Sequence, residues 1–152
     1  MKRSLCLAAA VLALSAPASA ALAGDVVVTL TGVQARGGHI VASFDTRDNF
    51  LSGRDHQARV ENTAAGDVVL TFTDVAPGEY ALAVMHDANS DGQFTMSPMG
   101  MPEEGWAFSN GDQPIMGPPS FDAHKITVPA EGLRLTERMQ YIDMSGMPGG
   151  SR

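Results

Sequence analysis

The chain has 152 residues and a formal net charge of −7. A protein this acidic repels the phosphates of nucleic acids and anionic membrane surfaces, so we exclude both classes of partner. Its length suffices for one domain with a single hydrophobic core and is too short for two.

Residues 1–20 have the pattern of a secretory signal peptide. Lys2 and Arg3 precede an apolar segment, residues 5–14, that is too short to span a bilayer, and a small-residue cleavage site follows at residues 18–20. A second cleavage site ends at Ala23. The only cysteine, Cys6, is removed with this signal, so the exported chain has no disulfide. We therefore expect a periplasmic or secreted protein with no membrane span after cleavage.

Beyond the signal, the sequence predicts strands and no helix. The clearest example of period-two alternation is in residues 80–85, where Tyr80, Leu82 and Val84 share the face that we expect to be buried. Pro-Gly and Gly-Gly pairs separate several of the strand patterns, as in hairpin turns. The expected strands are residues 26–31, 40–44, 58–61 (an edge strand), 67–75, 80–85, 123–128 and 133–141.

Six or seven short strands with turns between them predict an all-β fold, an antiparallel β-sandwich of the immunoglobulin-like or transthyretin-like type. We expect one domain over residues 24–142, with a loop at 45–57, a long loop at 87–120 and a flexible tail at 143–152. The order of the strands does not follow from the pattern. A connection as long as residues 87–120 is usually functional or disordered, and its aromatic residues favour a functional one.

The long loop begins with alternating oxygen-bearing side chains. Asp87, Asn89 and Asp91 precede a glycine, which resembles the first half of a calcium-binding loop in which the backbone carbonyl of Gln93 would be a further ligand. The pattern is not an EF-hand, because a strand precedes it and position twelve is not Glu. Two interpretations remain open: a Ca²⁺ site that orders the loop, or a turn in which these side chains accept hydrogen bonds from their own backbone.

Three methionines follow closely. Met96, Met99 and Met101 carry soft thioether sulfurs of the kind that select Cu(I), and His86 precedes them at the end of a strand. The sequence is thus compatible with a Cu(I)-binding, metal-handling protein. The competing interpretation is that the methionines pack beneath the loop against its aromatic residues, because Met is an adaptable filler of irregular space.

Catalysis is not expected. His86 adjoins Asp87 and His124 lies near Asp122, but neither a Gly-x-Ser-x-Gly nor a His-Glu-x-x-His motif is present. We therefore predict that the protein is not an enzyme.

Three blocks of the chain, residues 77–92, 100–110 and 117–122, resemble the exported bacterial family called domain of unknown function 2141. A looser resemblance extends over residues 26–141 and implies a small exported β-sandwich of Gram-negative bacteria with no assigned activity. The chain departs from the family at Thr95, where an acidic residue is frequent, and at Met101, where an aliphatic one is usual. The residues that match the family are His86, Asp87, Asn89, Gly92, Pro102, Glu104, Gly105, Phe108, Ser109, Asn110, Gly117, Pro118, Pro119 and Phe121.

We therefore predict a binding or interaction module whose long loop forms a cap over one end of the strands, the usual place for binding on such a fold. The ligand is an unknown protein or small molecule, and the sequence does not determine the oligomeric state. The expected binding surface consists of Glu104, Trp106, Phe108, Ser109, Asn110 and Phe121.

Overall fold

The structure, a computed structural model, describes residues 23–61, 64–111 and 118–142. The predicted signal peptide, the tail at 143–152, and Met116 and Gly117 of the long loop lie outside the described residues. The elements in chain order are β1 (Gly24–Val33), β2 (His39–Asp45), a 3₁₀ turn η1 (Arg47–Asn49), β3 (His56–Glu61), β4 (Gly66–Val75), β5 (Gly78–Asp87), β6 (Gly105–Phe108), α1 (Phe121–His124), β7 (Lys125–Val128) and β8 (Leu133–Arg138).

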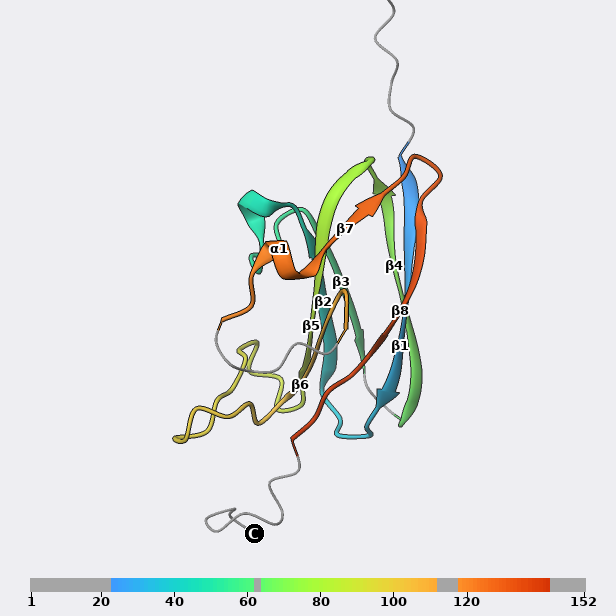
Figure 1. Cartoon of the computed structure of the whole chain (residues 1–152). Coiled ribbons are helices and arrows are strands. Elements are labelled where there is room, and N and C mark those ends of the chain that lie inside the picture. Colours follow the sequence, from blue (N-terminus) through green and yellow to red (C-terminus); the bar gives the residue numbers. More distant parts are fainter. Residues whose placement is uncertain (1–22, 62–63, 112–117, 143–152) are drawn as a thin grey trace, which may run out of the picture.

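The strands form two sheets that lie face to face, as Figure 1 shows. One sheet has the order β4-β1-β8, and the other has the order β3-β2-β5-β6 with β7 also paired to β5. All pairs are antiparallel except β1 with β8, which run parallel. The predicted all-β class is confirmed.

One hydrophobic core fills the space between the sheets. Its centre is Phe44 of β2, whose ring stacks on Phe72 of the opposite sheet at 5.4 Å and on Tyr80 of β5 at 5.0 Å between ring centroids. Alternation places these side chains inward, as predicted for residues 80–85. Each fully buried large apolar side chain contributes about 1.5–3 kcal/mol, so this layer of side chains holds the sheets together.

The structure corrects the predicted elements at three places. The described residues form eight strands, because β6 lies inside the segment predicted as a long loop. Its four residues are too few to show alternation, and they form a strand because residues 83–86 of β5 pair with them. The strand predicted over 123–128 begins only at Lys125, since Phe121–His124 form the single turn α1.

The strand predicted over 133–141 ends at Arg138, but the next residues remain attached to the sheets. Gln140 exchanges two backbone hydrogen bonds with Trp106, at 2.7 and 3.0 Å between N and O. This bridge joins the chain after β8, which belongs to the first sheet, to β6 of the second.

β6 and β7 share one edge of β5. β7 pairs with residues 78–81 of β5 and β6 with residues 83–86, so Leu82 lies opposite the gap between them. The gap is closed by Ser109, as described below. No helix within 23–61, 64–111 and 118–142 is long and apolar enough to cross a membrane.

Candidate binding cleft

The face of β2, β5 and β6 that points away from the core forms the floor of a cleft of about 990 Å³. Two rows of neighbouring side chains cross this floor. Val41, Met85 and Trp106 are in register in the first row. Ser43, Ala83 and Phe108 make up the second row.

Loops that are distant in the sequence form the walls of the cleft. Leu51, from the β2–β3 loop (residues 46–55), lies on one wall, and Phe94 and Met96, from the β5–β6 loop (residues 88–104), lie on another. These three apolar side chains are 51%, 43% and 46% exposed. A third wall consists of Pro118, Pro119, Ser120, Ala123 and His124. The result is a concave apolar surface whose exposed rim is also apolar.

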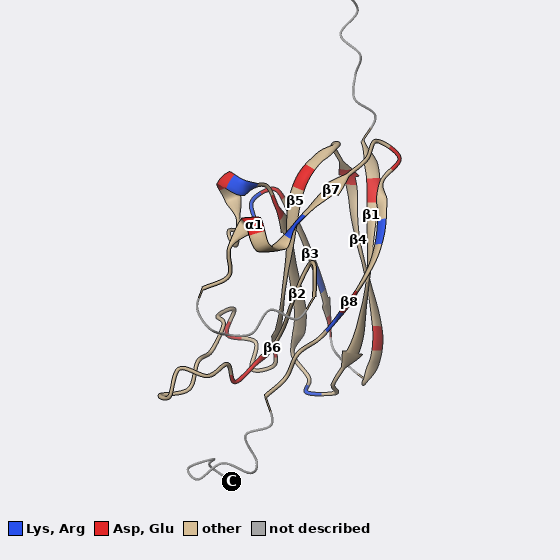
Figure 2. Ribbon diagram, viewed as in Figure 1, with Lys and Arg blue, Asp and Glu red and all other residues tan. Residues whose placement is uncertain are grey.

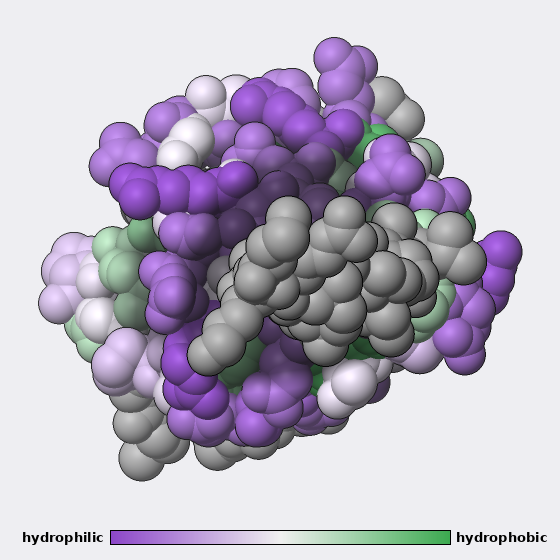
Figure 3. Space-filling model, turned by 90° about the horizontal axis from the view of Figure 1, so that it is seen from above, coloured by the Kyte–Doolittle hydropathy of each residue, from purple (hydrophilic) through white to green (hydrophobic). Residues whose placement is uncertain are grey.

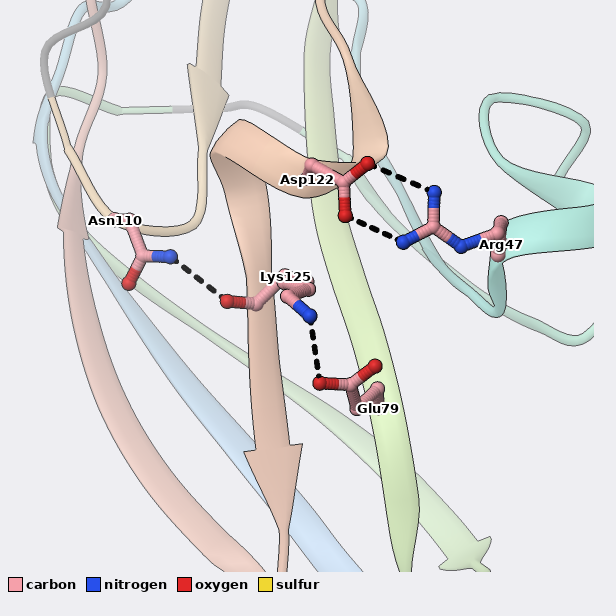
Figure 4. Close-up of polar contacts among 5 residues, drawn as sticks. All are labelled: Arg47, Glu79, Asn110, Asp122 and Lys125. Carbon is pink, nitrogen blue, oxygen red and sulfur yellow. Dashed lines mark hydrogen bonds and ion pairs between the residues drawn. The ribbon is translucent and has the colours of Figure 1, made fainter.

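The β2–β3 loop is held to α1 by an ion pair and by ring contacts. The guanidinium of Arg47 donates two parallel hydrogen bonds to the carboxylate of Asp122 (Figure 4), and it also lies 4.7 Å from the ring centroid of Phe121. Phe50 contacts the same ring edge-to-face at 5.9 Å. The Arg47 hydrogen bond lowers the pKa of Asp122, so this carboxylate stays ionised to a lower pH than an ordinary aspartate does. Two walls of the cleft are thereby fixed relative to one another.

Inside the β2–β3 loop, two carboxylates organise the backbone. Buried Asp45 accepts hydrogen bonds from the amides of Gly53 at 2.9 Å and Asp55 at 3.2 Å. Asp55 accepts from the hydroxyl and the amide of Thr46, both at 2.6 Å, and these bonds lower its pKa. The loop therefore has a defined shape and holds Leu51 at the cleft.

The junction between β6 and β7 is built on Ser109, whose side chain is fully buried. Its Oγ accepts a hydrogen bond from the amide of Leu82 at 2.9 Å and donates one to the carbonyl oxygen of His124 at 2.5 Å. Its own amide donates to the Leu82 carbonyl at 3.2 Å. Asn110 follows in the left-handed conformation, φ 65°, and its side-chain amide donates to the Lys125 carbonyl (Figure 4). Ser109 thus replaces the missing strand partner of Leu82.

The alternating side chains after β5 accept hydrogen bonds from backbone amides of the same loop. Buried Asp87 accepts from the amides of Asp91 and Gly92 at 3.0 and 3.1 Å. The side chain of Asn89 also accepts from the Asp91 amide, at 3.0 Å, and that of Asp91 from the Gln93 amide, at 2.8 Å. These contacts hold residues 87–93 in a defined fold, and no group of three or more His, Cys, Asp or Glu among the described residues is arranged to hold a metal. Calcium binding stays a prediction.

The side chain of His86 is fully buried, and both ring nitrogens have partners. Nε2 lies 2.9 Å from the carbonyl oxygen of Gly37 and therefore donates, while Nδ1 lies 2.8 Å from the hydroxyl of Tyr141 and accepts. Burial lowers the pKa of His86, which favours this neutral form.

A Cu(I) site made of His86 and the methionines would have to break one of these bonds. Met96 and Met99, at 46% and 69% exposed, lie in a tight turn of the β5–β6 loop that is closed by the hydrogen bond from the Ser97 amide to the Met101 carbonyl. Copper binding by His86 with Met96, Met99 and Met101 stays a prediction.

Glu104 is a buried carboxylate that is only half satisfied. It is 4% exposed; its Oε2 accepts from the amide of Thr95 at 3.2 Å, and its Oε1 has no hydrogen-bond partner among the described residues. Burial, with the nearby charges of Asp87 and Asp91, raises the pKa of Glu104, although the amides of Thr95 and Ala88 lower it in part. The ionised form of Glu104 therefore costs folding free energy.

We predict that Glu104→Gln stabilises the protein above the raised pKa. A carboxyl group whose pKa is raised in the folded state favours folding at low pH. This contribution is lost as the pH rises from the usual pKa of a glutamate, near 4.5, through the raised pKa of the folded protein. The Gln variant has no carboxyl to ionise, so its free energy of unfolding at pH 8 should exceed that of the wild type by about 1 kcal/mol. Thermal melts from pH 4.5 to 8 measure the difference. Glu103→Gln, which removes the same charge from an exposed neighbour, is the control, and identical pH profiles for all three proteins would contradict the prediction.

The comparison with protein families gave one finding. The family described as "Uncharacterized protein conserved in bacteria (DUF2141)" matches residues 28–135, which contain nearly all of the two sheets and the whole cleft. The chain belongs to this family. The predicted resemblance is confirmed. The searches of curated proteins and of solved structures found no match.

In this DUF2141 chain, the residues predicted as a binding surface separate into two groups. Trp106 and Phe108 line the cleft. The other four are structural neighbours of the cleft: Ser109 and Glu104 are buried in its framework, Asn110 caps the end of β6, and Phe121 is covered by Arg47 and Phe50.

Sequence reasoning missed the rest of the cleft. The pattern of β5 does indicate that Met85 and Ala83 face outward, because they alternate with its buried residues. Leu51 and Phe94 were visible as apolar residues in polar loops. No local signal indicated that these positions would meet, nor that His124 would join them.

Charged residues surround the cleft rather than line it. Figure 2 shows acidic and basic residues interspersed over the sheets, while the β5–β6 loop has acidic positions and no Lys or Arg. At the end of the molecule where the β4–β5 and β7–β8 turns lie, hydrophilic residues dominate the surface, with small hydrophobic patches between them (Figure 3). The part of this end that Figure 3 shows is therefore mainly polar, whereas the lining of the cleft is mainly apolar.

Proposed function

We propose that this DUF2141 protein is an exported binding module that takes a small, mainly apolar molecule in the cleft on the outer face of β2, β5 and β6. The cleft itself carries the proposal. Its volume of about 990 Å³ and its lining of apolar and aromatic side chains with a few neutral polar groups are typical of small-molecule sites. The role is binding rather than catalysis.

The backbone of Leu51 supports this proposal. Leu51 has φ 65°, a left-handed conformation that leucine rarely adopts, and its side chain is half exposed at the cleft. Such strain costs about 1–3 kcal/mol and persists only where the surroundings impose it, most often at binding and active sites. Here Asp45 and Asp55 impose the loop conformation that holds an apolar side chain at the rim, which suits ligand contact.

We also propose that the two layers form a β-sandwich of the immunoglobulin-like or transthyretin-like type in the periplasm or outside the cell. The common core and the mainly antiparallel pairing support the sandwich. The pattern of a signal peptide in residues 1–20 supports export.

The test is a titration of the mature protein with N-phenyl-1-naphthylamine, a neutral dye whose fluorescence rises in apolar sites. We expect saturable binding to the wild type. Ala83→Phe, which fills the floor between Ser43 and Phe108, should weaken binding at least about tenfold, a loss of 1.4 kcal/mol.

The matched control is Thr71→Phe, which places the same ring on the exposed face of β4 in the other sheet and should leave binding unchanged. Circular dichroism melts establish that both variants fold. Absence of dye binding by the wild type, or equal binding by Ala83→Phe, would refute the cleft as the site.

A further inference from the structure

We propose that the ligand of this cleft is an uncharged aromatic compound with a hydroxyl or N–H group, which donates a hydrogen bond to Nε2 of His124. The inference rests on the proposed function, because it specifies the class of ligand for the same site.

The hydrogen bonds of His124 determine which ring nitrogen carries the proton. Nδ1 lies 2.9 Å from the carbonyl oxygen of Ser109, and since a carbonyl only accepts, Nδ1 must donate. In the neutral ring the other nitrogen, Nε2, is then an acceptor. The two nitrogens point away from each other, so Nε2 faces away from Ser109.

Nε2 has no hydrogen-bond donor among the residues that the structure describes. His124 is 1% exposed and lines the cleft, and its ring stacks on Phe108 at 4.6 Å with an interplanar angle of 21°. Ser109 and Phe108 thus fix the ring on two sides. A fixed acceptor with no partner among the described residues is a favourable contact for a ligand that brings a donor, because a ligand that covered it without a donor would leave the hydrogen bond unmade, at a cost in free energy.

The floor of the cleft favours a flat aromatic ligand. Trp106 and Phe108 lie side by side on β6 in rows with Met85 and Ala83. Aromatic rings gain about 0.5–1.5 kcal/mol from stacked or edge-to-face contact beyond burial, and methionine sulfur contacts rings favourably as well.

The charge around the cleft favours a neutral ligand. The described residues that line it include no Asp, Glu, Lys or Arg, so neither an anion nor a cation would find a carboxylate, ammonium or guanidinium partner among them. Residues 87–124, which supply most of two walls, contain no Lys or Arg, and the chain has a net charge of −7. An anionic ligand would be repelled in addition to losing its hydration.

The experiment uses four naphthalene compounds in competition with bound N-phenyl-1-naphthylamine at pH 7.5. These are 2-naphthol, a neutral donor; 2-methoxynaphthalene, which is neutral without a donor; 2-naphthoate, an anion; and 2-naphthylmethylamine, which is a cation at this pH. We expect 2-naphthol to bind roughly three- to tenfold more tightly than 2-methoxynaphthalene, the usual size of one hydrogen bond. It should bind at least about tenfold more tightly than either charged compound.

His124→Phe keeps the stacked ring and removes Nε2, so the preference for 2-naphthol over 2-methoxynaphthalene should disappear. If the variant does not fold, the wild-type ratio of the two compounds decides alone. Equal binding of these two compounds to the wild type, or a charged compound that binds as tightly as 2-naphthol, would overturn the inference. So would a failure of all four to displace the dye. These outcomes bear only on the class of ligand. The proposed function stands as long as the wild type binds the dye and Ala83→Phe weakens that binding. If the wild type does not bind the dye, the proposed function itself is refuted.

Discussion

Gly105→Ala is expected to lower the free energy of unfolding by about 2–4 kcal/mol. Gly105 of β6 is buried, and the ring of Tyr141 lies directly across it. A Cβ added at Gly105 would lie 2.2 Å from Cε1 of that ring and 2.7 Å from Cζ, so the ring has to move. This movement breaks the hydrogen bond from the Tyr141 hydroxyl to Nδ1 of His86, which then lies buried without a donor.

Urea denaturation measures the predicted loss, and Gly78→Ala is the matched control. Gly78 also lies in a strand, but a Cβ there would meet the nearest ring atom of Tyr80 at 3.4 Å, an ordinary contact. We expect the control to change the free energy of unfolding by less than about 1 kcal/mol. Equal stability of the Gly105 and Gly78 variants would show that the close approach of Tyr141 is not required.

The Gly105 variant has a consequence for the cleft as well. Trp106 is the next residue of β6, and its backbone exchanges hydrogen bonds with Gln140, the residue before Tyr141. Displacement of Tyr141 should therefore disturb the position of Trp106 on the cleft floor. Because Trp106 is the only tryptophan, its fluorescence spectrum reports this change directly.

Ser109→Ala is expected to destabilise the protein by about 2–4 kcal/mol. The substitution removes one atom, Oγ, that serves two buried groups: the amide of Leu82 loses its acceptor and the carbonyl of His124 loses its donor. No other described contact replaces the hydroxyl at Leu82, because this residue lies opposite the gap between β6 and β7. Each buried polar group left without a partner costs about 1–3 kcal/mol.

Hydrogen exchange separates this mechanism from a general loss of stability. In Ser109→Ala the Leu82 amide should exchange faster than the other amides of β5, which keep their strand partners. Ser52→Ala is the control, since the Ser52 hydroxyl donates to the exposed carbonyl of Asn49 and water can replace it. An unchanged exchange rate at Leu82 would contradict the role assigned to Ser109.

The strands could be predicted from the sequence because each one is a local pattern. In residues 80–85 the apolar positions alternate with period two, and a strand with one buried face requires that period wherever its partners lie. β6 could not be predicted in this way, since four residues show no period and its hydrogen bonds come from β5. Likewise residues 121–124 form a helical turn whose side chains contact Arg47 and Ser109, and these contacts come from other parts of the sequence.

The candidate site was predicted only in part for the same reason. Trp106 and Phe108 were identified by residue type, and they do line a cleft, whereas Ser109 has a type common in binding sites but is buried in the framework. The polarity of a side chain does not reveal whether a backbone amide elsewhere in the fold needs it. The amide of Leu82 donates to the hydroxyl of Ser109 because β6 and β7 leave a gap opposite Leu82, where no strand offers a carbonyl.

The sequence by itself determined the all-β class, the strand faces that form the core, and membership of the DUF2141 family, because all three are properties of local pattern or of similarity along the chain. Only the tertiary structure decided where the cleft lies, that Nδ1 of His124 is bonded to Ser109, and that both ring nitrogens of His86 already have partners. These depend on side chains brought together from β2, β5, β6 and three loops, and such contacts form only when the sheets pair and pack.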